Sequence, residues 1–417
     1  MAVLPITLTE KEHDEFVKAH DRGDLLQLSS WANVKRQNGW FAERIAVATD
    51  GVTSGVALLL FKRVPKLPFT LCYAPRGFVV DYDDVASLTA LTEEAKRVAK
   101  ANKAITVKID PNIDRDEVPG LLTEMASLGF SHKGYGGGFD YAQPRFTMET
   151  DLRPSEKEIF GKFHHKFRYN VRLAERKGIV CTEVGRDGLK TFADLMKVTG
   201  ERDGFAIRGL DYFENLYDCL QPGDARLFLT KLEPKLALEQ QMATLEKAER
   251  DLGKIERSLE TETVEKKRTS LLNRQKQTGE QIEKIKAALP ELNELHDKYP
   301  NGLVLSGGLL TLAGRRSYYL YGASSNEFRD FMPNHLMQWT MMQAAKASGA
   351  ERYDFGGVSG STEPDDEYAG LYAFKSGWGS EMVEKVGEFD LVLNRPLYFA
   401  LETGLPLVKG LRKRLRR

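Results

Sequence analysis

A long helical segment interrupts an otherwise mixed strand and helix pattern between Glu233 and Pro300. A polar, leucine-free stretch from Glu260 to Ser270 divides this segment into two halves. Apolar residues recur every seven positions in both halves, at Leu238, Leu245, Leu252 and Leu259, then at Ile282 with Leu289 and at Ile285 with Leu292. Heptad spacing on both sides of a polar break predicts an antiparallel coiled-coil hairpin over residues 234–299.

Each arm of this hairpin is expected to hold roughly 28 residues and to span about 40 Å at the helical rise of 1.5 Å per residue. Thirteen Lys and Arg residues accompany thirteen Asp and Glu residues between Lys235 and Lys298. A neutral arm has no net field with which to attract RNA or a membrane. Two interpretations therefore stay open, a solvated spacer or dimerisation hairpin and a docking arm for a large partner.

The segments on both sides of the hairpin alternate between strand and helix patterns. The turn signal Asp50-Gly51 joins two strand-rich runs and predicts a β-hairpin. Further elements are expected as a helix over 83–101, a strand over 104–109, a basic helix over 155–177, a strand over 179–184, a helix over 189–202 and strand character over 304–320. This alternation of strands and helices predicts an α/β (α+β) fold whose second half contains the inserted hairpin.

The composition restricts the class of protein. A chain of 417 residues with 41% hydrophobic and 29% charged residues is long enough for two domains. Its formal net charge is zero, so any contact with nucleic acid or a membrane must come from a local patch. The start lacks the apolar run of a signal peptide, and the three cysteines are far apart, which predicts a cytosolic protein.

Motifs of conventional nucleophilic and metal catalysis are absent from the sequence. There is no GxSxG, no HExxH, no paired Cys and His, and no phosphate-binding GxxxxGK[ST] loop. The glycine cluster at 134–138 lies between strands and opens no helix, which argues against a dinucleotide site. We therefore expect neither a metal nor a coenzyme.

A set of cations and tyrosines forms the main chemical signal: Lys35, Arg208, Tyr212, Tyr319, Tyr321 and Lys375. Tyr319 and Tyr321 are expected on one face of a strand, because strand side chains repeat every two residues. Lys375 is expected in a loop bounded by Gly370 and Gly377. Such groups together suit a phosphate-bearing substrate with a sugar or peptide attached. Taken singly, each tyrosine also fits a packing role and the lysine a solvent-exposed one.

Several spaced motifs carry a resemblance to a known family. They are YAPRG (73–77), QPRFTMETDL (143–152), KFRYNVRLAERKG (166–178), YYLYGASS (318–325), PNHLMQW (333–339), RYDFGG (352–357) and YAFKSGWG (372–379). In this order, and with the hairpin in place, the chain resembles the Fem-type peptidoglycan bridge-forming aminoacyltransferases, the FemABX family.

The resemblance implies two acyltransferase-like domains of the GNAT type. The first would cover residues 1–150 plus 385–417, and the second would cover residues 151–384 with the coiled-coil hairpin inserted at 234–299. It also implies a tRNA-dependent aminoacyltransferase that needs no cofactor. Such an enzyme moves Ala, Ser or Gly from aminoacyl-tRNA to the side-chain amine of the stem peptide of lipid II or UDP-MurNAc-pentapeptide, building the interpeptide bridge.

Residue roles follow from the same resemblance. Lys35, Arg208, Tyr212 and Tyr321 would hold the acceptor, and the pair Phe374-Lys375 would meet the aminoacyl-tRNA end. The strand over 104–109 departs from some relatives, because it lacks a tyrosine that contacts the acceptor.

The expected chemistry needs few catalytic groups, because an aminoacyl ester is already activated. The protein must align two substrates, stabilise the oxyanion and accept one proton. Lys375 suits the oxyanion or a tRNA phosphate. Asp110 and Asp354 suit proton acceptance, and the capping of a turn is an equally open interpretation for each.

Two rival functions remain open. An acyl-CoA-dependent N-acyltransferase of the GNAT type would need a Q/R-x-x-G-x-G/A pyrophosphate cradle, which the sequence lacks. A non-enzymatic RNA-binding coiled-coil adaptor would depend on the hairpin and not on Lys375. The tail Lys409–Arg417 carries six cations and suits an anionic membrane surface or RNA, or serves only solubility.

Overall fold

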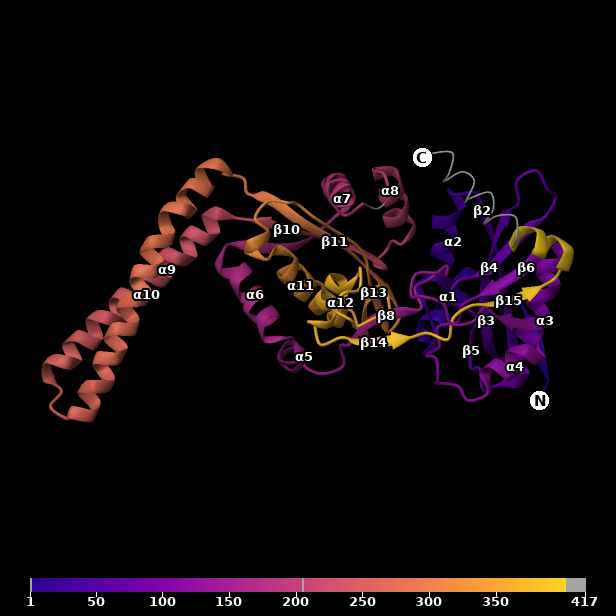
Figure 1. The fold of residues 1–417 in the computed structure, drawn as a ribbon, viewed down its shortest axis with the longest axis horizontal. Coiled ribbons are helices and arrows are strands. Elements are labelled where there is room, and N and C mark those ends of the chain that lie inside the picture. Colours follow the sequence, from indigo (N-terminus) through magenta and orange to yellow (C-terminus); the bar gives the residue numbers. More distant parts are fainter. Residues whose placement is uncertain (1, 205, 403–417) are drawn as a thin grey trace.

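The structure, a computed structural model, describes residues 2–204 and 206–402. These residues form two mixed sheets with helices packed on their faces, and a helical hairpin that projects away from the second sheet (Figure 1). The predicted α/β (α+β) fold with two sheet units is confirmed. The basic tail, Lys409–Arg417, lies outside the described residues.

The first sheet has the strand order β1-β2-β3-β4-β6-β15-β7, with β5 paired to β3. Its strands are β1 (Val3–Ile6), β2 (Trp40–Thr49), β3 (Val52–Arg63), β4 (Thr70–Ala74), β5 (Val79–Val80), β6 (Ala104–Ile109), β7 (Phe130–His132) and β15 (Phe389–Val392). The helical elements of this part are α1 (Glu10–Ala19), η1 (Leu25–Gln27), α2 (Ser29–Arg36), α3 (Val85–Ala101) and α4 (Leu121–Ser127). Asp50 and Gly51 both have positive φ, 50° and 85°, as the predicted tight turn requires.

The second sheet has the order β14-β8-β13-β12-β11-β10-β9. Its strands are β8 (Phe146–Asp151), β9 (Ile179–Val184), β10 (Ala225–Leu232), β11 (Leu303–Ala313), β12 (Arg316–Ser324), β13 (Arg352–Val358) and β14 (Glu381–Glu384). Its helical elements are α5 (Glu156–Lys162), α6 (His165–Arg176), η2 (Arg186–Gly188), α7 (Leu189–Asp203), α8 (Leu210–Cys219), η3 (Arg329–Phe331), α11 (Pro333–Ala347) and α12 (Ala369–Ser376). The chain therefore passes from one sheet to the other before Phe146 and returns between β14 and β15.

A single hydrophobic cluster joins the two sheet units. It contains Leu28 and Trp31 near α2, Leu58 on β3, Phe192 on α7 and Leu309 on β11, all buried. Because residues of both units share this cluster, separating them would expose apolar surface on each. The interface between the units is therefore fixed by packing, and the space beside it keeps its shape.

The basic segment 155–177 is not the single helix that its sequence predicts. It forms α5 and α6, separated by Phe163 and His164, whose ψ angles of 146° and 140° are extended. The backbone N–H of His164 donates to the carbonyl of Gly377 at 2.8 Å, and Phe163 is buried against Trp339 and Trp378. A long-range backbone bond and a buried ring thus break a locally favourable helix.

The hairpin consists of α9 (Pro234–Thr261) and α10 (Glu265–Lys298), which pack against each other along their length (Figure 1). Leu245, Leu252 and Leu259 are half-buried at one heptad position, while Ala248 and Ile255 are buried at the other. The second arm is longer than expected and continues through Pro290. Among the helices of the described residues, none is long and apolar enough to cross a membrane.

The heptad seam makes a direct prediction for the hairpin. Ile285 is 7% exposed, whereas Leu272 on the same helix is 47% exposed. Ile285→Ala should destabilise the hairpin by about 2 kcal/mol, because it removes buried methyl groups from the seam. Leu272→Ala should change its stability by less than about 0.5 kcal/mol. Amide hydrogen exchange within residues 234–298 measures both effects, and equal effects would contradict the seam.

Candidate functional site

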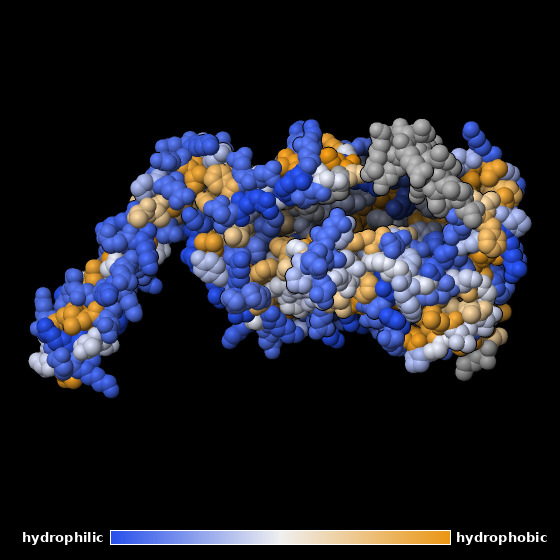
Figure 2. Space-filling view, in the orientation of Figure 1, coloured by the Kyte–Doolittle hydropathy of each residue, from blue (hydrophilic) through white to orange (hydrophobic). Residues whose placement is uncertain are grey.

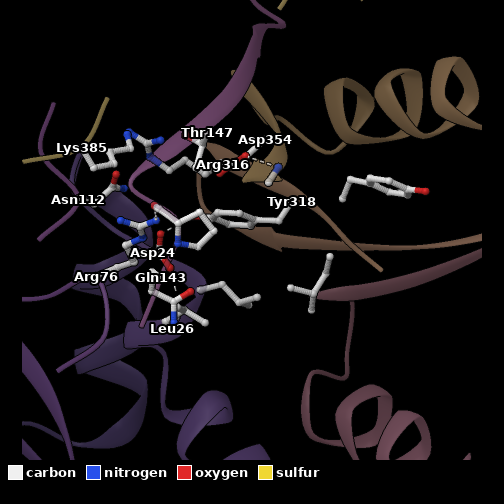
Figure 3. Close-up of a pocket in the computed structure, with 15 residues that line it drawn as sticks. Asp24, Leu26, Arg76, Asn112, Gln143, Thr147, Arg316, Tyr318, Asp354 and Lys385 are labelled. Carbon is white, nitrogen blue, oxygen red and sulfur yellow. Dashed lines mark hydrogen bonds between the residues drawn. The ribbon is translucent and has the colours of Figure 1, made fainter. Parts of the chain in front are cut away.

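A pocket of about 200 Å³ lies between the two sheet units (Figure 3). The first unit lines it with residues next to η1, after β4 and after β6. The second unit contributes residues of β8, β12 and β13 and the segment after β14. The polar side chains that line it are Asp24, Arg76, Asn112, Gln143, Thr147, Arg316, Tyr318, Tyr319, Asp354 and Lys385. In the space-filling view a hollow lies beneath the part that carries α7 and α8, above the part that carries α12 (Figure 2).

Asp24 and Tyr318 connect the two units at this pocket. Asp24 caps η1 by accepting a hydrogen bond from the N–H of Leu26 at 2.9 Å. Its second oxygen accepts one from the hydroxyl of Tyr318 on β12, also at 2.9 Å. Burial, and then the charge of Asp24, raise the pKa of Tyr318 well above its usual value, so the phenol stays protonated as the donor.

Glu149 on β8 gathers three cations behind the pocket. Its carboxylate lies 3.1 Å from Nζ of Lys385, 3.4 Å from Arg316 and 3.3 Å from Arg352. Burial favours the protonated form of Glu149, but the Lys385 and Arg316 charges outweigh it and lower its pKa to about 2. Lys385 also lies 2.9 Å from Asp114 of the first unit. The carboxylate thus stays ionised and ties the second sheet to the chain that returns to the first.

Asp110 follows β6, as predicted, and its carboxylate is buried. It accepts hydrogen bonds from the hydroxyl of Tyr73 at 3.0 Å and from the N–H of Arg76 at 2.7 Å. Burial raises the pKa of Asp110 to about 7, against the opposing charge of Arg76. Because both oxygens already have donors, its contacts are those of a residue that fixes the turn after β4.

Lys375 does not lie in the predicted loop. It belongs to α12, which runs through Gly370 and ends at Ser376, and its side chain is buried. Its Nζ donates to the carbonyl of Gly357 on β13 at 2.8 Å. The preceding residue of this strand, Gly356, lines the pocket. The contact with β13 fixes the lysine in place.

Asp354 and Lys375 influence each other electrostatically across this end of the pocket. Burial lowers the pKa of Lys375 to about 8, with the Asp354 charge acting in the opposite direction. Burial, and then the Glu149 charge, raise the pKa of Asp354 to about 6. One oxygen of Asp354 accepts from the N–H of Gly356 at 2.6 Å. The pair therefore titrates closer to neutral pH than either group does in water.

Phe374 belongs to an aromatic cluster beside the pocket and not to its wall. Its ring centroid lies 5.9 Å from that of His335 and 6.0 Å from those of Phe167 and Trp378. Burial, and then the charge of Lys166, lower the pKa of His335 to about 4, so this imidazole is neutral at pH 7. The cluster positions α12 and with it Lys375.

The structure brings together four residues of the predicted acceptor set. Tyr212 on α8 and Tyr321 on β12 place their hydroxyls 2.8 Å apart. The guanidinium of Arg208 lies 5.1 Å from the ring of Tyr212. Burial, and then the charge of Arg208, lower the pKa of Lys35 on α2. The group combines one side chain of the first unit with three of the second, and we name it the cation–tyrosine cluster.

Tyr319 does not join this cluster, and the prediction that it shares a face with Tyr321 is wrong. The pairing of β12 with β11 shifts between Tyr319 and Tyr321, which marks a β-bulge. Tyr318 and Tyr321 therefore pack toward the shared core cluster, whereas Tyr319 packs on the other face against Phe355. The hydroxyl of Tyr319 lies over Gly322, so a Cβ atom at position 322 would collide with it.

Several residues in and behind the pocket lie in sequence motifs but were not predicted as site residues. Arg76 lies in YAPRG and Glu149 lies in QPRFTMETDL, the motifs that carried the family resemblance. Tyr318 begins YYLYGASS. Asp24 and Lys385 had no such signal, because only the fold brings them together. Within residues 2–204 and 206–402, no group of three or more His, Cys, Asp or Glu side chains is placed to hold a metal ion.

Comparison with known proteins identifies the family. The FemAB family profile matches residues 8–404. The chain belongs to the FemAB family. The predicted resemblance to Fem-type enzymes is confirmed.

Curated relatives of the chain match it over nearly its whole length. The lipid II:glycine glycyltransferase of Staphylococcus haemolyticus (strain JCSC1435) is 49% identical over 404 residues, covering 96% of both chains. The protein of the same name from Staphylococcus aureus (strain MSSA476) is 49% identical over 403 residues, covering 96% of this chain and 95% of its own. A solved structure described as FemX superposes with a TM-score of 0.89 at 49% identity, over 95% of this chain and 99% of that one.

The buried lysine makes stability depend on pH in a defined direction. The pKa of Lys375 is about 8 in the folded chain, and that of an unfolded lysine is about 10.4. Between these values the unfolded chain binds a proton that the folded chain has lost, so the free energy of unfolding rises with pH. Relative to Lys375→Met, the wild type should gain ~2 kcal/mol from pH 8 to pH 10.

Paired thermal melts between pH 8 and 10 measure this difference. All other titrating groups are common to the two proteins, so they largely cancel. A difference in Tm that stays constant across this range would contradict the depressed pKa of Lys375.

Proposed function

We propose that this chain transfers glycine from glycyl-tRNA to the side-chain amine of the stem peptide of lipid II, and so builds the interpeptide bridge of peptidoglycan. The observation that carries the proposal is the likeness to lipid II:glycine glycyltransferases, at 49% identity over nearly the full length of both chains. Among the predicted amino acids, Ala, Ser and Gly, these relatives favour glycine. Among the predicted acceptors they favour lipid II over UDP-MurNAc-pentapeptide.

The cation–tyrosine cluster suits the acceptor. Lys35 and Arg208 offer two positive charges to a diphosphate, and the hydroxyls of Tyr212 and Tyr321 offer hydrogen bonds to sugar or peptide groups. The cluster adjoins the pocket, because β12 carries Tyr321 as well as Tyr318, which lines it. An acceptor held by its diphosphate would extend its stem peptide between the two sheet units.

The pair Lys375 and Asp354 suits the transfer step. The amine attacks the carbonyl carbon of the glycyl ester, and the new C–N bond forms. The ester C–O bond then breaks, and the tRNA oxygen leaves as a hydroxyl after it takes up the proton that the amine has lost. The ammonium of Lys375 stabilises the negative oxygen of the tetrahedral intermediate. Asp354 accepts the proton that leaves the amine, because one of its oxygens has no donor assigned within the site, whereas both oxygens of Asp110 are occupied.

The reaction would take place at the cytoplasmic face of the membrane, where a soluble donor and a lipid-linked acceptor meet. The cytosolic location and the membrane contact of Lys409–Arg417 stay predictions. No step in this scheme calls for a metal or a coenzyme.

Incubation with defined donors and acceptors tests the proposed function. Glycyl-tRNA and lipid II should give lipid II that is heavier by glycyl residues, and treatment of the donor with ribonuclease beforehand should abolish the product. Mass spectrometry of the lipid fraction measures it. Transfer from glycyl-CoA that equals transfer from glycyl-tRNA would favour the acyl-CoA-dependent alternative and would refute the proposal.

Replacement of the catalytic lysine should abolish most activity. Lys375→Met keeps the buried volume but removes the charge, so kcat should fall roughly 100-fold or more, as for loss of one oxyanion donor. Lys346→Met is the matched control, because Nζ of Lys346 also donates to a backbone carbonyl, that of Leu152, at 2.7 Å. The control should keep kcat within about twofold, and a folded Lys375→Met variant with the wild-type kcat would refute the role.

The two cations of the cluster should act on acceptor binding alone. Lys35→Ala and Arg208→Ala should each raise the KM for lipid II by roughly tenfold and leave the KM for glycyl-tRNA unchanged, because they remove ground-state binding of one substrate. Arg36→Ala is the control, since Arg36 is an exposed cation next in sequence to Lys35. A rise confined to the KM for glycyl-tRNA would contradict this role and would indicate that the two cations bind the tRNA.

A further inference from the structure

One exposed face of α6 carries cations that have no acidic partner. Lys166, Tyr169, Arg172 and Arg176 follow one another at spacings of three, three and four residues, so they form one stripe along the helix. All four are exposed, and Tyr169 is 55% exposed. Within the described residues none of the three cations has a carboxylate at ion-pair distance. We name these four residues the α6 stripe.

Several other exposed cations of the described residues are neutralised by neighbours. On the hairpin, Lys286 pairs with Glu249 at 3.0 Å and Lys254 with Asp251 at 3.3 Å. On α7, Lys190 pairs with Asp194 at 2.8 Å. Because the chain has no net charge and its hairpin is neutral, the α6 stripe is a local patch of uncompensated positive charge.

The stripe begins beside the proposed catalytic lysine. The positive charge of Lys166 contributes to the lowered pKa of His335, whose Nε2 lies 3.1 Å from Nδ2 of Asn170 on α6. His335 packs against Phe374, the neighbour of Lys375. A ligand that lies along the stripe therefore reaches the aromatic cluster that positions α12.

The stripe ends at the base of the hairpin. The carbonyl of Arg176 accepts a hydrogen bond from Gln241 on α9 at 3.4 Å, and Lys177 lies 3.8 Å from Glu291 on α10. Figure 1 shows α6 between α5 and this base. From Lys166 to Arg176 the helix covers about 15 Å at 1.5 Å per residue. The stripe thus runs along α6 from the base of the hairpin to the aromatic cluster next to Lys375.

The chemistry of the stripe matches RNA better than a lipid surface. Spaced cations neutralise successive phosphates, and an exposed aromatic ring offers a surface on which an unpaired base stacks. A membrane-binding helix would expose apolar residues, but Val171 and Ala174 of α6 are buried against the core. We propose that the α6 stripe binds the acceptor arm of the donor tRNA and directs its 3′ end toward Lys375. This inference rests on the proposed function and assigns its RNA-binding surface.

Binding of uncharged tRNA tests the stripe without any need for catalysis. The triple variant Lys166→Gln, Arg172→Gln, Arg176→Gln should bind tRNA at least roughly tenfold more weakly, and the slope of log Kd against log salt should fall by about 2 to 3. The matched control is Lys66→Gln, Lys100→Gln, Lys103→Gln, which removes three exposed cations of the first sheet unit and causes the same change in net charge. The control should bind within about twofold of wild type.

A second variant keeps every charge. Tyr169→Ala should weaken tRNA binding by roughly tenfold through loss of base stacking. Both stripe variants should raise the KM for glycyl-tRNA and leave the KM for lipid II unchanged, which general misfolding would not do.

The outcomes separate this inference from the proposed function. If wild type and the triple variant bind tRNA equally while glycyl transfer from tRNA proceeds, the stripe assignment is refuted and the proposed function stands. If the triple variant keeps tRNA binding but loses binding to phosphatidylglycerol vesicles, the stripe is a membrane surface and the inference is refuted. If the wild type neither binds tRNA nor uses glycyl-tRNA, the proposed function is refuted, and the stripe assignment is refuted with it.

Discussion

The buried carboxylate of Glu149 is the interaction on which the site depends most. It holds Lys385, Arg316 and Arg352 from three separate segments, and Lys385 in turn reaches Asp114 of the first unit. Removing Lys385, which is buried like Glu149, would leave the carboxylate short of its main partner and cost about 3–5 kcal/mol. Burial raises the pKa of Asp354 beside Lys375, and the charge of the same carboxylate raises it further. One charge therefore helps to join the two sheet units and contributes to the raised pKa of the proposed proton acceptor.

The arrangement of the two units explains why the proposed substrates would meet between them. The shared core cluster and the bond from Tyr318 to Asp24 fix the interface, and the pocket lies directly beside it. The cation–tyrosine cluster occupies the side next to α2 and α8. The α6 stripe and the hairpin occupy the side next to α12. A lipid-linked acceptor and a large RNA donor would thus approach from different directions without competing for the same surface.

Local patterns predicted the elements well where local forces determine them. The strands over 104–109 and 179–184 and the heptad hairpin follow from apolar periodicity, and the structure contains them with those limits or close to them. Long-range contacts caused the errors. The bond from His164 to Gly377 splits the basic helix, a bulge in β12 reverses Tyr319, and the contact with Gly357 buries Lys375. The pocket as a whole was not predictable, because Asp24 and Tyr318 are 294 positions apart.

A crystal structure with a short-chain, water-soluble lipid II analogue tests the central claim most directly. The proposed site predicts the diphosphate against Lys35 and Arg208, with the stem peptide running between the two sheet units. The side-chain amine should then lie within hydrogen-bonding reach of Asp354, about 3 Å, and beside Lys375. A diphosphate bound at another surface, or a stem peptide whose amine points away from this pocket, would contradict it.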